Sequence, residues 1–324
     1  MAANLLANLD DFHRPLYQNI TAAIISVVLF AGLFKFYSDP LRHIPGPFIA
    51  RLTPLWLWKL TWSGIECRTI SALHQKYGPV VRIAPNEVDV SDGAALGPIY
   101  IKNGGFPKSP NYQNFDIDGF ATIFSDLDSA RRAIRAKAVA PLFAQQAIVK
   151  GKAALEKVAD AMVTELERKK ANAHGRPVDV MNLFRALAID TVTLYLFGHS
   201  FDGVGAEHLS ATAFIDNFVA GGRFFYLPGW LYDYVDYWAT KFDKEKLEAT
   251  TSSDIVTQFA TKLVDKSIAE DKGEGQTYQS RLLAAGISRE ETIAQVVDVM
   301  FAGTDAHGRI MSVISCYLAQ CLDK

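Results

Sequence analysis

The residues of this sequence best suited to chemistry lie near its carboxyl end, in the segment Met300-Phe301-Ala302-Gly303-Thr304-Asp305. An adjacent pair of small residues and a carboxylate interrupt an otherwise apolar stretch. Glycine destabilises a helix interior by about 1 kcal/mol relative to alanine, and a buried carboxylate requires a partner. One interpretation is a flat group held close to the helix, with Asp305 taking part in its chemistry. The alternative is close helix packing, with Arg309 pairing to Asp305 along the same helix.

A long helix must carry this segment. Ser288 and Glu291 have the spacing of a capping box, in which the serine side chain accepts a hydrogen bond from the backbone N–H three residues on. Apolar residues then follow on almost every side of the helix as far as Ile314. A helix that is apolar all round is typical of a protein interior, so we predict that this one is buried.

Three arginines, Arg131, Arg132 and Arg135, gather on a second predicted helix, shortly before the segment 141–143. The planar guanidinium group donates two parallel hydrogen bonds to a carboxylate. Three such groups within five positions indicate recognition of an acidic ligand. The alternative is an ordinary solvated face of a helix.

The remaining patterns predict a mainly α protein with a small β part. A helix is expected to end at Gly78-Pro79, and two short strands, 80–83 and 87–90, follow on either side of a turn. After these, helical periodicity dominates. Two of the predicted helices cover residues 152–170 and 180–197.

The amino end contains an apolar run, residues 20–37, that is long enough to cross a bilayer as a helix. Basic residues follow the run and acidic ones precede it, which predicts that the bulk of the protein faces the cytosol. A buried helix is the alternative. Asn19 heads an Asn-x-Thr glycosylation motif on the luminal side of this topology. The predicted organisation is a luminal amino terminus at 1–19, an anchor at 20–37, a proline-rich hinge at 38–47 and one domain at 48–324.

Composition excludes some functions. A formal net charge of -2 argues against nucleic acid as a partner, because phosphate binding requires a basic surface. The three cysteines, Cys67, Cys316 and Cys321, have neither the number nor the spacing of a disulfide framework or a metal site. We predict no metal ligands among them and interpret all three as buried thiols.

Several segments, taken in order, resemble the amino-terminal part of a cytochrome P450, a membrane-anchored haem-thiolate monooxygenase of the kind found in fungal secondary metabolism. Each motif is weak by itself, but six in the same order make a specific pattern. They are the apolar anchor, Ile44-Pro45-Gly46-Pro47, Tyr77-Gly78-Pro79 before two strands, the arginines before Pro141-x-Phe143, Ala188-Ile189-Asp190 leading to Phe197-Gly198, and Ala302-Gly303-Thr304-Asp305.

The resemblance implies a site. Arg131, Arg132 or Arg135 would meet the haem propionates, although counting back from Phe143 puts Ala136 at the usual arginine position. Ala302 and Gly303 would line the oxygen pocket, and Asp305 would belong to a proton relay. The same resemblance implies an NADPH-dependent reductase as partner, a small hydrophobic substrate, contact with membrane lipid, and location in the endoplasmic reticulum membrane.

The sequence also departs from the family. Ala306 stands where the family has a threonine that helps to deliver protons. Neither Cys316 nor Cys321 has the glycine-rich frame of the cysteine that binds the iron, so the axial ligand is absent from these 324 residues. The motif Glu-x-x-Arg occurs only at Glu165 to Arg168, on the wrong side of the long helix, where we interpret it as chance.

These departures lead to a prediction with two alternatives. The prediction is a truncated and inactive form of a haem-dependent monooxygenase, with an incomplete domain that ends in the long distal helix. The first alternative is an active monooxygenase whose real chain is longer. The second is a non-catalytic binding module tethered to the membrane.

Overall fold

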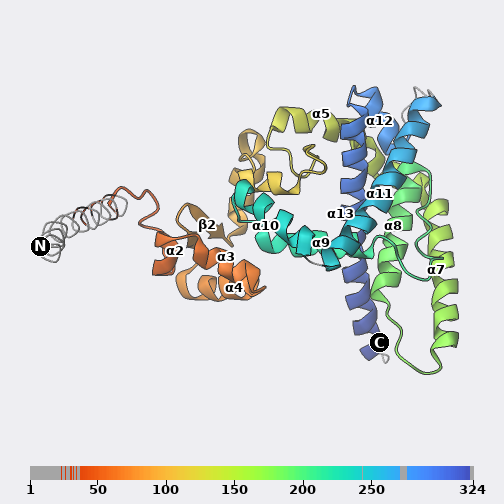
Figure 1. Cartoon of the computed structure of the whole chain (residues 1–324), viewed down its shortest axis with the longest axis horizontal. Helices are drawn as coiled ribbons and strands as arrows, with labels where there is room; N and C mark the ends of the chain where they lie inside the picture. Colours follow the sequence, from red (N-terminus) through yellow and green to blue (C-terminus); the bar gives the residue numbers. More distant parts are fainter. Residues whose placement is uncertain are drawn as a thin grey trace, which may run out of the picture. The chain divides into compact units, whose positions relative to one another are not determined.

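The computed structural model describes residues 37–242, 244–270 and 276–321, with single positions between 23 and 34 (Figure 1). The chain divides into two compact units, the first ending at Asn103 and the second beginning at Gly104. Asn19 and most of the predicted anchor lie outside the described residues. No helix within the described part of the chain combines the length and apolar character needed to span a bilayer.

The first unit contains short helices and one antiparallel strand pair. Its elements are α2 (Phe48–Leu52), α3 (Leu55–Trp62), α4 (Glu66–Tyr77), β1 (Val80–Ala84), β2 (Glu87–Val90), η1 (Gly93–Ala95), η2 (Gly97–Ile101) and η3 (Lys102–Gly104). The strands pair as the sequence predicts. Helix α4 ends where Gly78 adopts a φ of 97°, a conformation that favours glycine.

The turn around Pro45 and Gly46 is held against β1. The backbone N–H of Arg82 donates to the Pro45 carbonyl at 2.8 Å. A methyl group on Gly46 would collide with the carbonyl of Arg82. Arg82 itself is buried and pairs with Asp39. The glycine is therefore required by a close backbone approach, which makes the proline-rich turn rigid.

The second unit is helical. Its elements are η4 (Pro110–Phe115), α5 (Ser129–Val139), η5 (Ala140–Phe143), α6 (Gln145–Lys150), α7 (Lys152–Ala173), α8 (Met181–Phe197), α9 (Thr212–Gly221), η6 (Gly222–Phe224), α10 (Gly229–Phe242), α11 (Lys244–Ala269), α12 (Tyr278–Ala284) and α13 (Arg289–Gln320). Both named strands of the described residues belong to the first unit. Helices make up nearly all the other elements, which confirms the prediction of a mainly α protein with a small β part.

Helix α8 lies at the centre of the second unit. It packs most extensively against α13 and also contacts α7, and Figure 1 shows these helices side by side, with α13 in dark blue. Most of its side chains are buried, and it ends at Gly198 as predicted, with a φ of 74°. The hydrophobic core is built around α8 from residues of α7, α11, α12 and α13.

Helix α13 begins as predicted but is buried over only part of its length. Ser288 Oγ accepts a hydrogen bond from the Glu291 N–H at 3.2 Å. Val296 and Met300 are at most 1% exposed, whereas Ile310 and Val313 are 58% and 68% exposed. The prediction of a helix buried throughout is therefore wrong for its carboxyl-terminal part, because apolar periodicity does not say how far the packing partners extend.

The three cysteines are not buried thiols either. Cys67 and Cys316 are exposed, and Cys321 is partly buried. Cys316 and Cys321 lie at the carboxyl-terminal end of α13, and Cys67 lies on α4. The prediction was wrong for the two α13 cysteines because that end of the helix is largely uncovered in the described structure.

Candidate functional site

Asp305 lies between two arginines from different helices. Arg309, one turn further along α13, places its Nε 2.9 Å and 3.0 Å from the two carboxylate oxygens, which confirms the predicted pair. Arg185 of α8 donates from Nη2 to Asp305 Oδ1 at 2.7 Å. The Arg185 side chain is 1% exposed, against 48% for Arg309. The more buried of the two cations is therefore the one that sequence reasoning missed.

Arg185 extends this network towards solvent. Its Nη2 also lies 2.9 Å from Asp216 Oδ1 on α9, and the Asp216 side chain is 56% exposed. A charged path therefore runs from a solvent-exposed carboxylate, through a buried guanidinium group, to a carboxylate on α13. The signal for it in the sequence was one arginine amid the apolar residues that follow Met181.

The glycines of α13 serve helix packing. A methyl group on Gly303 would lie 2.5 Å from Val192 Cγ2, and one on Gly308 would lie 2.5 Å from Arg185 Cγ. Helix α8 therefore fills the space that these glycines leave, which confirms the packing interpretation. Ala302 and Ala306 lie on another side of α13 and are exposed. We call the side that carries these two alanines the open face of α13.

All three arginines of α5 have partners within the chain, and two of them share Asp126. Arg131 donates from Nε and Nη2 to the buried carboxylate of Asp126, at 2.8 Å and 2.7 Å. Arg135 donates to Asp126 at 2.5 Å and to Glu291 of α13 at 2.7 Å. Arg132 donates from Nε to the Ile123 carbonyl at 3.0 Å. Two of the arginines thus recognise carboxylates, as their chemistry predicts, but these carboxylates belong to the chain itself.

The solvated-face interpretation is wrong for Arg135, whose side chain is 1% exposed. Burial alone would raise the pKa of Asp126, but the hydrogen bonds from Arg131, the Asp128 N–H and Arg135 together lower it to about 2. Among the described residues Arg132 pairs with no carboxylate, and its side chain is exposed. It is the arginine of this group that has most capacity left for an outside anion.

Aromatic rings gather next to the open face. Phe301 precedes Ala302 and packs on Phe218 of α9 with 3.8 Å between ring centroids. Further ring contacts of 5.1 to 6.2 Å continue the group through η4 and η6. The aromatic cluster consists of Tyr112, Phe115, Phe124, Phe214, Phe218, Phe225, Tyr226 and Phe301. It gives α13 a hydrophobic neighbourhood beside Asp305.

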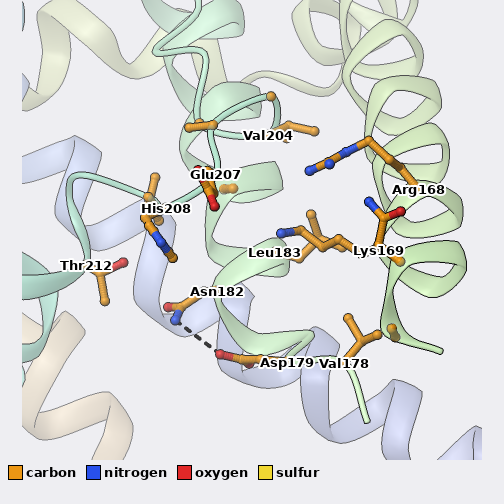
Figure 2. A pocket seen from close by; sticks show the side chains of 17 residues that line it. Arg168, Lys169, Val178, Asp179, Asn182, Leu183, Val204, Glu207, His208 and Thr212 are labelled. Atoms are coloured by element: carbon orange, nitrogen blue, oxygen red, sulfur yellow. Dashed lines mark hydrogen bonds between the residues drawn. The ribbon is translucent and has the colours of Figure 1, made fainter. Parts of the chain in front are cut away.

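A surface cavity of about 960 Å³ lies elsewhere in the second unit (Figure 2). Figure 2 shows Arg168 and Lys169 of α7 on one side and Glu207 and His208 on the other. Asp305 and the arginines of α5 do not line it. Arg168 is paired with Glu165 through two 2.7 Å bonds. This ion pair lies within one helix, so the Glu-x-x-Arg match is a local contact of α7.

The resemblance implies haem, and the residues can be tested for their fit to it. The open face carries Ala302 and Ala306, which are exposed and small enough for a planar group to approach. Gly303 does not fit the predicted pocket role in the same way, because Val192 occupies the side that its missing Cβ leaves open. Arg132 fits a propionate better than Arg131 or Arg135. The open face of α13 and the Arg132 side chain are thus compatible with haem.

In this mainly helical protein the long helix α13 carries a carboxylate and small residues and lies beside a cluster of aromatic rings. The profile of the cytochrome P450 family matches residues 50–320, and the chain belongs to this family. It is 35% identical to the cytochrome P450 monooxygenase mfmF of Annulohypoxylon moriforme, over 94% of this chain and 65% of that protein.

Two further relatives come from other fungi. The chain is 33% identical to the cytochrome P450 monooxygenase tazI of Aspergillus terreus, over 55% of this chain and 36% of that protein. It is 26% identical to the cytochrome P450 monooxygenase sdnF of Sordaria araneosa, over 90% of this chain and 58% of that protein. The chain therefore spans less than two thirds of the length of these relatives.

Proposed function

We propose that this chain supplies part of a haem-dependent monooxygenase of fungal secondary metabolism, namely the part that lies on the face of the haem where oxygen binds. The observation that carries the proposal is the ion-pair network of Asp216, Arg185 and Asp305. It places an oriented carboxylate, Asp305, on α13, the helix that carries the open face. Family membership supports the class of reaction. When bound, haem would supply the oxygen-activating chemistry.

The chain's own residues have distinct roles in this proposal. Asp305 would hold and release a proton and exchange it with solvent directly, because its side chain is 14% exposed. Arg185 would keep its own proton and orient the carboxylate. Arg132 would bind a propionate. The aromatic cluster would exclude water and bind a small hydrophobic substrate. Ala306 cannot donate a proton, so Asp305 would deliver protons without a hydroxyl at that position.

We further propose that the 324-residue chain is inactive by itself. None of its cysteines has the glycine-rich frame of the family's iron ligand, and a haem iron must be held by an axial ligand. The alternative is an active enzyme whose real chain is longer. We propose that the protein lies in the endoplasmic reticulum membrane, with its bulk facing the cytosol. A full-length form would have an NADPH-dependent reductase as partner. The apolar run at 20–37 and the charges around it support this location.

A membrane-tethered binding module is the second candidate function. The uncovered apolar residues at the carboxyl-terminal end of α13 are the observation that favours it, since large exposed apolar patches are typical of interaction surfaces. A haem-free chain that is stable and monodisperse in detergent would support this candidate over the enzyme. Aggregation of the haem-free chain would count against it.

A carbon monoxide difference spectrum tests the proposed function. Reduced membranes that contain the 324-residue chain should show no red-shifted Soret band of thiolate ligation and should oxidise nothing. If the transcript continues in frame past Lys324 into a glycine-framed cysteine, the longer product should show that band. In that product Asp305→Asn should slow oxygen-dependent turnover more than it weakens substrate binding. A thiolate band from the 324-residue chain would overturn the inactivity proposal.

A further inference from the structure

The segment 121–126 is bonded to α13 through one buried amide side chain. Gln295 is 0% exposed. Its Oε1 accepts from the Ile123 N–H at 2.8 Å, and its Nε2 donates to the Ala121 carbonyl at 3.1 Å. The side-chain amide thus engages the backbone through one donor and one acceptor, as a neighbouring strand would. This pairing leaves no polar group of the Gln295 side chain unsatisfied in a dry environment.

Asp298 bonds to the same segment from three residues further along α13. Its carboxyl is almost completely buried, and the Thr122 hydroxyl and the Phe124 N–H favour its ionised form. The Phe124 N–H itself donates to Thr122 Oγ1 at 3.2 Å. Residues three apart lie on the same side of a helix. Gln295 therefore bonds this short piece of chain to α13, and Asp298 faces the same piece one turn further along the helix.

Cations bond to the segment from other elements. Lys108 donates to the carbonyls of Ile123, at 3.1 Å, and Phe124. Arg132 also donates to the Ile123 carbonyl, at 3.0 Å. Within the segment the Thr122 N–H donates to the Ser125 hydroxyl at 2.9 Å. Because so many of its backbone groups have side-chain partners, the segment has little freedom to move while these bonds hold.

The segment carries Phe124 into the aromatic cluster. The Phe124 ring is 44% exposed and lies 5.4 Å from Tyr112 and 5.8 Å from Phe115, measured between centroids. Asp298 and Ala302 are four residues apart on α13, so they share a side and lie roughly 6 Å apart along the axis. The segment therefore borders the open face of α13.

We infer that Gln295 and Asp298 are positioning residues that clamp the segment 121–126 beside the open face of α13, with Phe124 as the ring that this clamp presents to a hydrophobic substrate. The identity of the substrate site rests on the proposed function. The clamp itself depends only on contacts within the chain, so it can be tested without haem.

The clamp should respond to pH. Burial raises the pKa of Asp298 from 3.8 to about 6, although the Thr122 hydroxyl, the Phe124 N–H and the charge of Lys108 favour ionisation. Tyr278 of α12 also faces this carboxyl, and burial raises the pKa of that phenol as well. Asp298 therefore binds its proton more tightly in the clamped state than in the released state, so low pH favours the clamped state. Release should therefore increase as pH rises from about 4 to 6, by up to roughly a hundredfold, and then level off.

Lys108 is the cation that lies near Asp298. Burial lowers its pKa, and so does the nearby charge of Arg132, whereas Asp126 and Asp298 raise it. The ordinary pKa of a lysine lies far above pH 6. The change expected between pH 4 and 6 is therefore assigned to Asp298, and Asp298→Asn isolates it.

Amide hydrogen exchange followed by mass spectrometry tests the clamp on the full chain. Gln295→Met removes both side-chain bonds at nearly constant volume and should raise exchange in 121–126 at least tenfold. Exchange in the buried part of α11, residues 256–264, should stay unchanged. Gln258→Met is the matched control, because Gln258 is exposed on α11 and should alter neither segment.

Asp298→Asn separates the clamp from a general effect on stability. Asparagine keeps a polar oxygen next to the segment but cannot ionise, so exchange in 121–126 should lose its pH dependence beyond the intrinsic chemistry. An unchanged pH profile would overturn the role of Asp298. Equal loosening of 121–126 and 256–264 by Gln295→Met, or loosening of neither, would overturn the clamp. The proposed function is tested separately by the carbon monoxide spectrum, so either idea can fail alone.

Discussion

The two ends of α13 carry similar apolar residues in opposite surroundings. Val296 and Met300 in the first half are at most 1% exposed, whereas Val313 and Tyr317 in the second half are 68% and 65% exposed. Helix α13 contacts α8, α11 and α12, and its residues in the hydrophobic core all belong to the first half, up to Phe301. An apolar helix therefore becomes a core element only as far as its neighbours reach.

The length of α8 explains where along α13 the side chains change from buried to exposed. Val192 of α8 faces Gly303 and Arg185 faces Gly308, so the two helices run antiparallel. Helix α8 begins at Met181, one turn before Arg185. Residues of α13 beyond about 312 therefore extend past the start of α8. The ion pairs of Asp305 lie close to this boundary.

The largest effect is expected where α8 and α13 share a buried charge. Arg185→Met should lower the free energy of unfolding by about 3 kcal/mol, because Asp305 loses its buried partner. Arg309→Ala should cost less than about 1 kcal/mol, since Arg309 is half exposed. Equilibrium unfolding in urea, followed by circular dichroism, measures both. Equal losses would show that the pair within α13 is the one that matters.

Two methionines on α13 provide a matched comparison of its ends. Met300→Ala should lower the free energy of unfolding by about 2 to 5 kcal/mol, because the residue is 1% exposed and its removal leaves a cavity. Met311→Ala, at a position that is 38% exposed, should change it by less than about 0.5 kcal/mol. The same urea titration reports both values. Similar losses would mean that the second half is covered in solution.

Acid should weaken the amino-terminal end of α13. Asp126, which holds Arg135 against Glu291, has a folded-state pKa of about 2, below its ordinary value of 3.8. A depressed pKa contributes stability that is complete above pH 4 to 5 and is lost as pH falls towards 2, here about 2 kcal/mol. Asp126→Asn should flatten this loss when stability is measured against pH. Asp265→Asn, which removes the exposed pair with Arg289, should have a smaller effect.

The smallest effect on stability is expected at the uncovered end. Val313→Ser should change the free energy of unfolding by less than about 0.5 kcal/mol but should reduce self-association, because it interrupts an exposed apolar surface. Sedimentation velocity in detergent measures the association. Arg309→Ala is the control for a change nearby that leaves the apolar surface intact. An unchanged distribution of oligomers for Val313→Ser would argue that this surface does not drive association.

Local patterns determined much of the secondary structure. The strands around the Pro85-Asn86 turn and the end of α8 at Gly198 follow from turn residues and periodicity over short spans. The pairing of Asp305 with Arg309 follows from their spacing along one helix. Each of these features is decided by residues within about one or two turns of one another, so the sequence alone was sufficient to predict them.

Tertiary packing alone decided the partners of the candidate site. Arg185 and Asp305 are 120 residues apart, Arg135 and Glu291 are 156 apart, and Gln295 reaches a segment more than 170 residues earlier. No periodicity or capping signal connects such positions. The family resemblance indicated which segments would form the site. Whether an arginine meets a ligand or a carboxylate of its own chain depends on how the helices pack, because burial and charge pairing are properties of the packed helices together.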